Sequence, residues 1–215
     1  MILKIIKVNT DVDIITNSYI ILDENKKEGA IIDPGGEADK IIEMISSLEV
    51  QIKYIIITHC HIDHIGALNQ IKEYTKATVL MSRRGSEEIN NPDMNLSRYF
   101  GKELTNINID ARIDDGDLIH VGDLEFKVIE TPGHTEDGIC LYCEKEKLVF
   151  SGDTMFASSW GRTDLPSGSM EKIMDSISNK LLILPDETVV YPGHDRPTTV
   201  GDEKVIYNEL RETDI

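Results

Sequence analysis

A short stretch of the chain concentrates residue types that bind metals. It reads Thr58-His59-Cys60-His61-Ile62-Asp63-His64-Ile65-Gly66, so three imidazoles and a carboxylate fall within six positions. In an extended segment successive side chains alternate in direction, so His59 and His61 project to one side while Cys60 projects to the other. Two neutral imidazoles with one residue between them form a chelating pair. Asp63 and His64 follow where they can address a second ion, so the pattern predicts a metal site.

The flanking residues predict that this site lies between a strand and a helix. Residues 54–58 are apolar and β-branched, as in a buried strand, and apolar residues from Ile65 to Tyr74 recur at helical spacing. This is where α/β sheets usually present their chemistry. An alternative interpretation makes Asp63 a helix N-cap and the histidines ordinary loop residues. It is disfavoured because five of only six histidines occur in matching contexts.

Further candidate ligands follow other predicted strands. A strand that ends in Pro-Gly-His occurs twice, at His134 and at His194, and a third strand ends in Ser-Gly-Asp153. Catalytic zinc takes three protein ligands and keeps one position for water, and imidazole with carboxylate suits Zn, Fe or Mn. Seven candidates are enough for two metals: His59, His61, Asp63, His64, His134, Asp153 and His194.

Two other polar residues are not counted among the candidate ligands. Asp33, before Pro34-Gly35-Gly36, either orients a ligand from behind or caps a turn. His120 is predicted to be a surface histidine, with no acidic neighbour on its face.

The remaining sequence predicts alternating strands and helices without a linker, so residues 1–215 are expected to form one domain. Residues 91–109 are irregular and are expected to wall a pocket, and residues 155–168 are expected to form a loop over the metals. Strands are predicted at 2–8, 17–23, 28–32, 52–57, 77–81, 117–121, 124–130, 138–143, 147–151 and 187–191. Helices are predicted at about 38–48, 65–75, 83–90, 169–182 and 202–212.

Composition limits the partners and the compartment. Thirty-nine acidic and 22 basic residues give a net charge of −17, which argues against nucleic acid and anionic membranes as partners. There is no long apolar run, and Met1 to Val8 alternates as a strand does rather than a signal peptide. The three cysteines form no disulfide-like framework; Cys140 and Cys143 are predicted to face opposite sides of one strand as apolar fillers. These features predict a cytoplasmic protein, and they leave its oligomeric state open.

The ordered motifs resemble the metallo-β-lactamase superfamily, and in particular its glyoxalase II-like (hydroxyacylglutathione hydrolase-like) branch. The resemblance runs from Asp33 to about Thr199 and implies an α/β fold, a four-layer αββα sandwich of two mixed β-sheets with the metals at one edge. It implies two divalent metal ions, with zinc favoured over iron or manganese, and it makes Asp63 and Asp153 the expected catalytic residues. By position, it assigns His59, His61 and His134 to metal one, Asp63, His64 and His194 to metal two, and Asp153 to a bridge.

The chain also departs from glyoxalase II. That family has a helical C-terminal domain that helps to hold glutathione, whereas this chain stops soon after His194. The segment Trp160-Gly161-Arg162-Thr163-Asp164 instead resembles short stand-alone glyoxalase II-like hydrolases and persulfide dioxygenases. Arg162 is a candidate substrate-binding residue that clamps a carboxylate; alternatively, it pairs with Asp164 and fixes the loop.

The two relatives imply two reactions. In the first, a metal-bridging hydroxide cleaves a small-molecule hydroxyacyl thioester, and the lack of an obvious separate general acid suits a thiolate leaving group. In the second, one Fe(II) on His59, His134 and Asp153 oxidises a persulfide with O₂. The segment 197–199 favours the hydrolase. A purely structural zinc site is disfavoured because such sites prefer cysteine ligands, and the acidic charge disfavours an RNA-processing relative.

Overall fold

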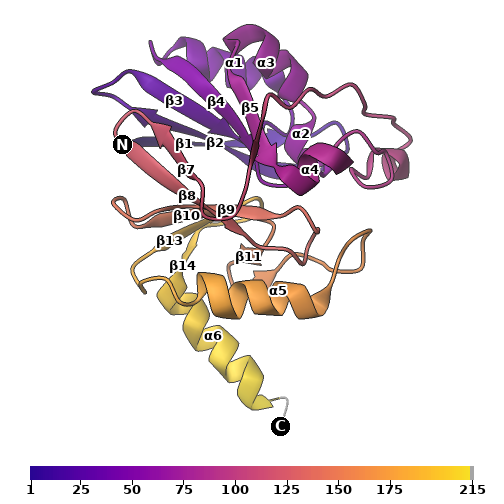
Figure 1. Ribbon diagram of the computed structural model, residues 1–215, viewed down its shortest axis with the longest axis vertical. Helices are drawn as coiled ribbons and strands as arrows, with labels where there is room; N and C mark the ends of the chain where they lie inside the picture. The colour runs from indigo at the N-terminus through magenta and orange to yellow at the C-terminus, as the bar shows by residue number, and fades with distance from the viewer. Residues whose placement is uncertain (214–215) are drawn as a thin grey trace.

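Two six-stranded mixed β-sheets pack face to face in the computed structural model, which describes residues 1–213 and the side chains of residues 1–208 (Figure 1). In the first sheet, β1 to β3 are antiparallel and β3 to β6 are parallel. Its strands, in spatial order, are β1 (Ile2–Asn9), β2 (Ile15–Asp23), β3 (Glu28–Ile32), β4 (Gln51–Ile57), β5 (Thr78–Ser82) and β6 (Ala111–Ile113).

The second sheet is mostly antiparallel, with one parallel pair formed by β10 and β13. Its strands, in spatial order, are β14 (Thr198–Thr199), β13 (Val189–Pro192), β10 (Leu148–Gly152), β9 (Ile139–Cys143), β8 (Leu124–Glu130) and β7 (Leu118–Val121). Since β9 runs against both neighbours, β8, β10 and β13 all point the same way. Their carboxyl ends therefore meet at one edge.

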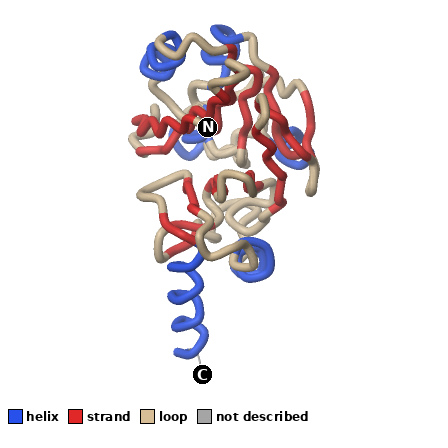
Figure 2. The backbone as a smooth tube through the Cα atoms, turned by 90° about the vertical axis from the view of Figure 1, so that its left-hand side faces the viewer, coloured by secondary structure: helices blue, strands red, loops and turns tan. Residues whose placement is uncertain are grey.

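Helices cover the outer face of each sheet (Figures 1 and 2). The first sheet carries α1 (Ala38–Ser46), α2 (Ile62–Ile65), α3 (Leu68–Thr75) and α4 (Arg83–Glu88), and the irregular segment beyond α4 contains the 3₁₀ turn η1 (Ser97–Phe100). The second sheet carries α5 (Met170–Ser176), continued by the π-helical turn η2 (Ile177–Leu181), and α6 (Val200–Thr213).

Three hydrophobic clusters lie between the four layers. The outer face of the first sheet packs on α1 and α3 through residues such as Ile55, Ile41 and Ile71. A second cluster, around Phe126 and Phe150, fills the space between the sheets, and a third joins the second sheet to α5, η2 and α6. The predicted αββα sandwich is therefore confirmed.

Several element boundaries differ from the predictions. The helix expected at 65–75 begins earlier and divides into α2 and α3. The helix is interrupted at Gly66 and Ala67, where the backbone passes close to Gly35. The expected loop at 155–168 contains a small hairpin, β11 (Met155–Phe156) with β12 (Ser159–Trp160). The short edge strands β6 and β14 were not predicted, since two or three residues give too little alternation to detect.

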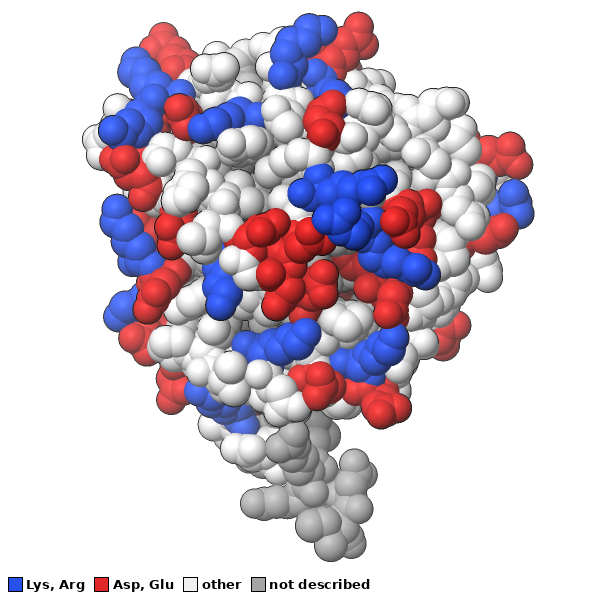
Figure 3. Space-filling model, viewed as in Figure 1, with Lys and Arg blue, Asp and Glu red and all other residues white. Residues whose placement is uncertain are grey.

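Surface charge is mixed on the face shown in Figure 3, where basic side chains are interspersed among acidic ones and an acidic group lies near the centre. Across residues 1–213, no helix is long and apolar enough to cross a membrane.

Candidate metal centre

The seven predicted ligands all lie just beyond the carboxyl ends of four strands. Four of them follow β4 of the first sheet, and one each follows β8, β10 and β13 of the second sheet. The structure brings their ligand atoms into overlapping groups, within each of which the atoms lie within 4.8 Å of one another. These groups are His59, His61 and His134; His59, His64 and Asp153; and Asp63, His64 and His194.

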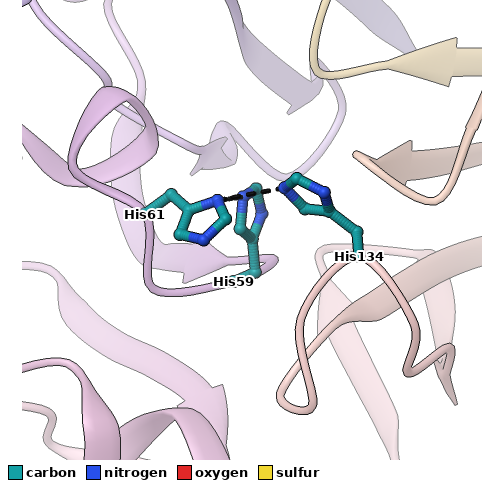
Figure 4. Close-up of side chains that lie close together, drawn as sticks. All are labelled: His59, His61 and His134. Atoms are coloured by element: carbon teal, nitrogen blue, oxygen red, sulfur yellow. Dashed lines mark hydrogen bonds between the residues drawn. The ribbon is translucent and has the colours of Figure 1, made fainter. Parts of the chain in front are cut away.

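The first group contains three imidazoles whose rings point toward one another (Figure 4). His61 Nδ1 lies 3.2 Å from His59 Nε2 and 3.0 Å from His134 Nε2. His134 Nδ1 donates a hydrogen bond to the carbonyl oxygen of Arg162 at 2.7 Å. His59 Nδ1 lies 3.1 Å from the hydroxyl of Thr58. With protons on these Nδ1 atoms, both Nε2 lone pairs face the same point as His61 Nδ1.

The protonation of this group favours a bound cation. Burial, reinforced by the neighbouring imidazoles, lowers the pKa of His59 well below its usual range and that of His61 to about 3. Both rings are therefore neutral at pH 7. At most one of the two contacts to His61 Nδ1 can be a hydrogen bond, because a single proton on that nitrogen cannot serve both Nε2 atoms. Among the described residues, His61 Nε2 also lacks a partner although it is buried. This donor set fits a divalent metal ion.

The second group joins Asp63, His64 and His194. Asp63 Oδ2 lies 3.6 Å from His64 Nε2 and 3.3 Å from His194 Nε2. His194 Nδ1 donates to the carbonyl oxygen of Ile15 at 2.8 Å, so its Nε2 faces the other ligands. Burial alone would lower the pKa of both histidines, but Asp153 and Asp63 outweigh burial and raise it, to about 10 for His194. Metal binding here must displace protons.

Asp153 lies between the two groups. Its Oδ2 is 3.5 Å from His134 Nε2 and 3.2 Å from His194 Nε2, and its Oδ1 is 3.4 Å from His64 Nε2. This is the geometry that a bridging carboxylate needs. Gly193 allows the close approach, since a Cβ there would clash with Asp153 and His64.

Asp33 supports both groups from behind. Its carboxylate accepts hydrogen bonds from the Thr58 backbone N–H at 2.8 Å, the Thr58 hydroxyl at 2.6 Å and His64 Nδ1 at 3.0 Å. Because the Thr58 hydroxyl donates to Asp33, it accepts from His59 Nδ1. Asp33 is thus the orienting residue that one of its two interpretations predicted, and it fixes the tautomers of His59 and His64. The role of Thr58 was not predicted from the sequence.

A cavity of about 610 Å³ opens above the two groups. As predicted for the segment 91–109, Leu96, Tyr99 and Phe100 form one wall. The segment 155–168, expected to lie over the metals, supplies Phe156, Trp160 and Leu165 to the lining, whereas sequence reasoning missed Ile14. A single apolar residue in a polar turn, such as Ile14, was the one available signal.

Arg162 also lines this cavity, and its guanidinium already has a partner. Its Nε and one terminal nitrogen each lie 2.7 Å from a different carboxylate oxygen of Asp164. Both side chains are exposed, so the pair adds little stability. The predicted pair of Arg162 with Asp164, which fixes the loop, is therefore present, and the Arg162 side chain also belongs to the cavity lining.

The remaining predictions concern residues away from the two groups. His120 is exposed, as expected, but it has an acidic cross-strand neighbour in Glu125, 3.9 Å away; the expected lack of one was wrong. Cys140 packs toward α5 and Cys143 packs between the sheets, which confirms that they face opposite sides. Cys60 projects to a separate buried group.

Comparisons with known proteins agree with this geometry. The profile of the metallo-β-lactamase superfamily matches residues 12–194. The chain is 39% identical to an uncharacterized protein of Aquifex aeolicus over 95% of this chain and 94% of that one. It is 34% identical to the hydroxyacylglutathione hydrolase GloC of Haemophilus influenzae, over 87% of this chain and 89% of that one.

Solved structures give the same fold. The B3 metallo-β-lactamase BLEG-1 superposes with a TM-score of 0.88 at 32% identity, covering 95% of this chain and 97% of that one. ETHE1 from Myxococcus xanthus gives 0.79 at 32%, covering 95% and 82%. TTHA1623, in a di-iron-bound form, gives 0.80 at 29%, covering 93% and 96%. The matched profile and the identities above 30% show that the chain belongs to the metallo-β-lactamase superfamily.

Proposed function

We propose that this chain is a binuclear metal-dependent hydrolase that cleaves a small-molecule thioester, with a hydroxyacyl thioester as the first candidate. The observation that carries the proposal is the pair of ligand groups that share Asp153 at the floor of an apolar cavity. The 34% identity to a hydroxyacylglutathione hydrolase supports the substrate class. The likeness to a di-iron protein leaves the metal open, and we propose zinc first, with iron or manganese as alternatives.

The ligand residues have distinct tasks in this proposal. When bound, two divalent ions lower the pKa of water and polarise a carbonyl oxygen. His59, His61 and His134 present neutral imidazoles for one ion, and Asp63, His64 and His194 serve the other. Asp153 faces both groups and sets their separation. Asp63 and Asp153 thereby act as catalytic residues through the ions that they hold.

The cavity lining favours a leaving group that needs no proton. Among the described residues that line it, the titratable groups outside the ligand set are Tyr99 and Arg162. No carboxylic acid is placed to protonate an amine. A thiolate, with a pKa of about 8.5 in the free thiol, leaves without such help, so the lining supports a thioester rather than an amide.

The apolar walls support loose selection of the substrate. Leu96, Phe100, Phe156 and Trp160 line the cavity, and Arg162 adds a cation to this lining. Aromatic walls accept many acyl or thiol groups, whereas one guanidinium selects for a carboxylate. We expect a high KM, tolerance of different thiols and a preference for acidic substrates.

A persulfide dioxygenase is the second candidate. The likeness to ETHE1 favours it, and it requires one Fe(II) held by His59, His134 and Asp153. In this case Asp63, His64 and His194 would act as hydrogen-bonding neighbours. Residues 197–199 resemble the stand-alone hydrolases, so we rank the hydrolase above the dioxygenase.

Thiol release and oxygen uptake measured on the same samples separate the two functions. Zinc-loaded and iron-loaded protein would be assayed with S-lactoylglutathione and with glutathione persulfide. We expect thioester cleavage that is independent of oxygen, two ions bound by the seven candidate ligands, and near-complete loss of activity in Asp153→Ala. Asp175→Asn, which changes an exposed carboxylate on α5, is the control. Persulfide-dependent oxygen uptake without thioester cleavage, with a single iron that survives Asp63→Ala, would overturn the hydrolase.

We also propose a cytoplasmic location. The support comes from the three cysteines, which are all buried and unpaired, as is usual in a reducing compartment. Fractionation of the native host tests this.

A further inference from the structure

A second cluster of potential ligands lies behind the metal centre. It consists of the Cys60 thiol, the Glu88 carboxylate and the Asp137 carboxylate, whose ligand atoms lie within 4.8 Å of one another. Cys60 is the residue between the ligands His59 and His61, Glu88 ends α4, and Asp137 lies in the turn that follows His134. None of these three residues belongs to the candidate metal centre above.

The cluster is buried, and its polar atoms lack partners. Cys60, Glu88 and Asp137 are 1%, 8% and 2% exposed. Neither carboxylate oxygen of Asp137 has a well-aligned hydrogen-bond partner among the described residues, although the Thr135 hydroxyl and the Cys60 backbone N–H lie nearby, and Glu88 Oε2 has none. The other oxygen of Glu88 pairs with Arg84 at 2.7 Å. Buried polar atoms without partners are rare and require an explanation, and here three of them lie in one cluster.

The local backbone holds these groups in place. The Asp137 carbonyl oxygen accepts a hydrogen bond from the hydroxyl of Ser82 at 2.8 Å, and the same hydroxyl caps the start of α4 by accepting from Gly85 N–H at 3.1 Å. A Cβ on Gly85 would lie 2.7 Å from Asp137 Oδ2. These contacts hold the turn at Asp137 against the start of α4.

The charges require compensation. In its fully ionised form, the cluster carries three negative charges, and Arg84 supplies one positive charge. A divalent cation supplies the remaining two. Without a cation these buried charges are not compensated, and burial raises the pKa of Asp137 to about 7.

We propose that Cys60, Glu88 and Asp137 bind a thiophilic divalent cation such as zinc, separate from the candidate metal centre. Bond lengths of about 2.0–2.3 Å to oxygen and sulfur place two ligand atoms of a tetrahedral ion roughly 3.3–3.8 Å apart. The ligand atoms of this cluster lie within 4.8 Å of one another, so they would move about an ångström closer when the ion binds. A thiolate with two carboxylates suits zinc or Fe(II) better than magnesium or calcium. Three protein ligands leave a fourth position for water.

Such a cation would tie together the segments that carry the histidines. It would link the loop of His59 and His61, the turn after His134 and the end of α4, and so hold the first imidazole group from behind. Met94, whose carbonyl oxygen accepts from the Cys60 thiol at 3.6 Å, would lose that contact when the thiol ionises.

Cobalt substitution provides a specific test, because the seven ligands of the main centre are nitrogen and oxygen atoms only. A sulfur-to-cobalt charge-transfer band in the near ultraviolet therefore reports cysteine ligation. We expect the folded, cobalt-loaded chain to show this band and to hold one more ion than Cys60→Ala or Asp137→Asn. The double variant Cys140→Ala/Cys143→Ala keeps the band, since these thiols lie in other clusters.

Two variants keep the test decisive if one fails to fold. Asp137→Asn preserves the thiol and the volume of the side chain, and Glu88→Gln alters the third ligand alone. An absent band together with an ion count that is the same in the parent chain and in either folded variant would overturn the proposal. It would show instead that Asp137 and Cys60 hold protons. Since no substrate is present, this outcome is independent of whether the chain hydrolyses thioesters.

Discussion

Replacing Asp33 by asparagine tests how the two ligand groups are oriented. Asp33 is buried and has a left-handed φ of 50°, a conformation that asparagine tolerates well. The amide oxygen can still accept from the Thr58 backbone N–H, as Oδ1 does now at 2.8 Å. The amide nitrogen would then face His64 Nδ1, where a carboxylate oxygen now accepts at 3.0 Å.

The substitution reverses the hydrogen bond to His64. An amide N–H requires a lone pair on His64 Nδ1, so the ring proton must move to Nε2. That atom faces Asp63 and Asp153 at 3.6 and 3.4 Å, and with its proton it can no longer hold a metal. We expect the affinity for the second ion to fall about 10- to 100-fold. Activity should fall with occupancy and recover in part at high metal concentration.

The expected loss of stability follows from the same oxygen, which accepts from both His64 Nδ1 and the Thr58 hydroxyl. Two hydrogen bonds to a charged group are exchanged for weaker neutral ones, which costs about 2–3 kcal/mol and lowers the melting temperature by roughly 4–12 °C. Asp33→Ala removes all three bonds and should cost about 3–5 kcal/mol, as when one partner of a buried network is deleted. Thermal unfolding of the metal-free chains measures these costs, and chelator competition measures affinity.

Glu203→Gln is a matched control. Glu203 is also a buried carboxylate, and it accepts from Ser158 N–H at 3.0 Å and from the Thr198 hydroxyl at 2.7 Å. It should lose similar stability but retain both ions. The reasoning fails if Asp33→Asn binds two ions as tightly as the parent chain, or if both variants lose metal equally.

Three further predictions concern the cavity rim, a tight turn and the metals. Arg162→Ala should raise KM several-fold for a thioester with a carboxylate at nearly unchanged melting temperature, while Asp164→Asn should lower KM by freeing the guanidinium. The hydrogen bond from Arg162 lowers the pKa of Asp164 to about 2. The ion pair is therefore intact above the ordinary carboxyl pKa of 3.8 and is lost only as the pH falls toward 2. The ratio of the KM values of these two variants should accordingly be constant from about pH 5 to pH 8. Gly133→Ala should cost about 3 kcal/mol in denaturant unfolding, because φ is 144° and a Cβ would overlap the backbone of Ile173, whereas Gly116→Ala, at φ 85° in open space, should cost about 1 kcal/mol; equal costs would contradict this. Chelation should lower stability by about 2.7 kcal/mol relative to metal at 100 times its Kd, and an unchanged melting temperature would argue against metal binding.

The sequence by itself determined the fold class and the candidate ligands. The ligands follow from short-range chemistry: the spacing of His59 and His61 on an extended segment, and Pro-Gly turns that stop a strand just before His134 and His194. The fold class follows from the family that the order of these motifs resembles. Buried strands such as 52–57 can also be predicted, because they are nearly continuous runs of apolar residues. These signals lie within a few residues, so no knowledge of distant contacts is needed.

Only the tertiary structure decided how the ligands are held and what surrounds them. The Asp33 carboxylate reaches Thr58 and His64 across 25 and 31 positions of sequence, and the sequence left its role open between orienting and capping. The cavity lining at Ile14, in the turn before β2, and at Trp160, in β12, comes from segments far apart in the sequence, and neither residue has a periodic pattern. The group of Cys60, Glu88 and Asp137 depends on three separate segments packing behind one loop. Such contacts arise from packing between layers, which local propensity and spacing do not encode.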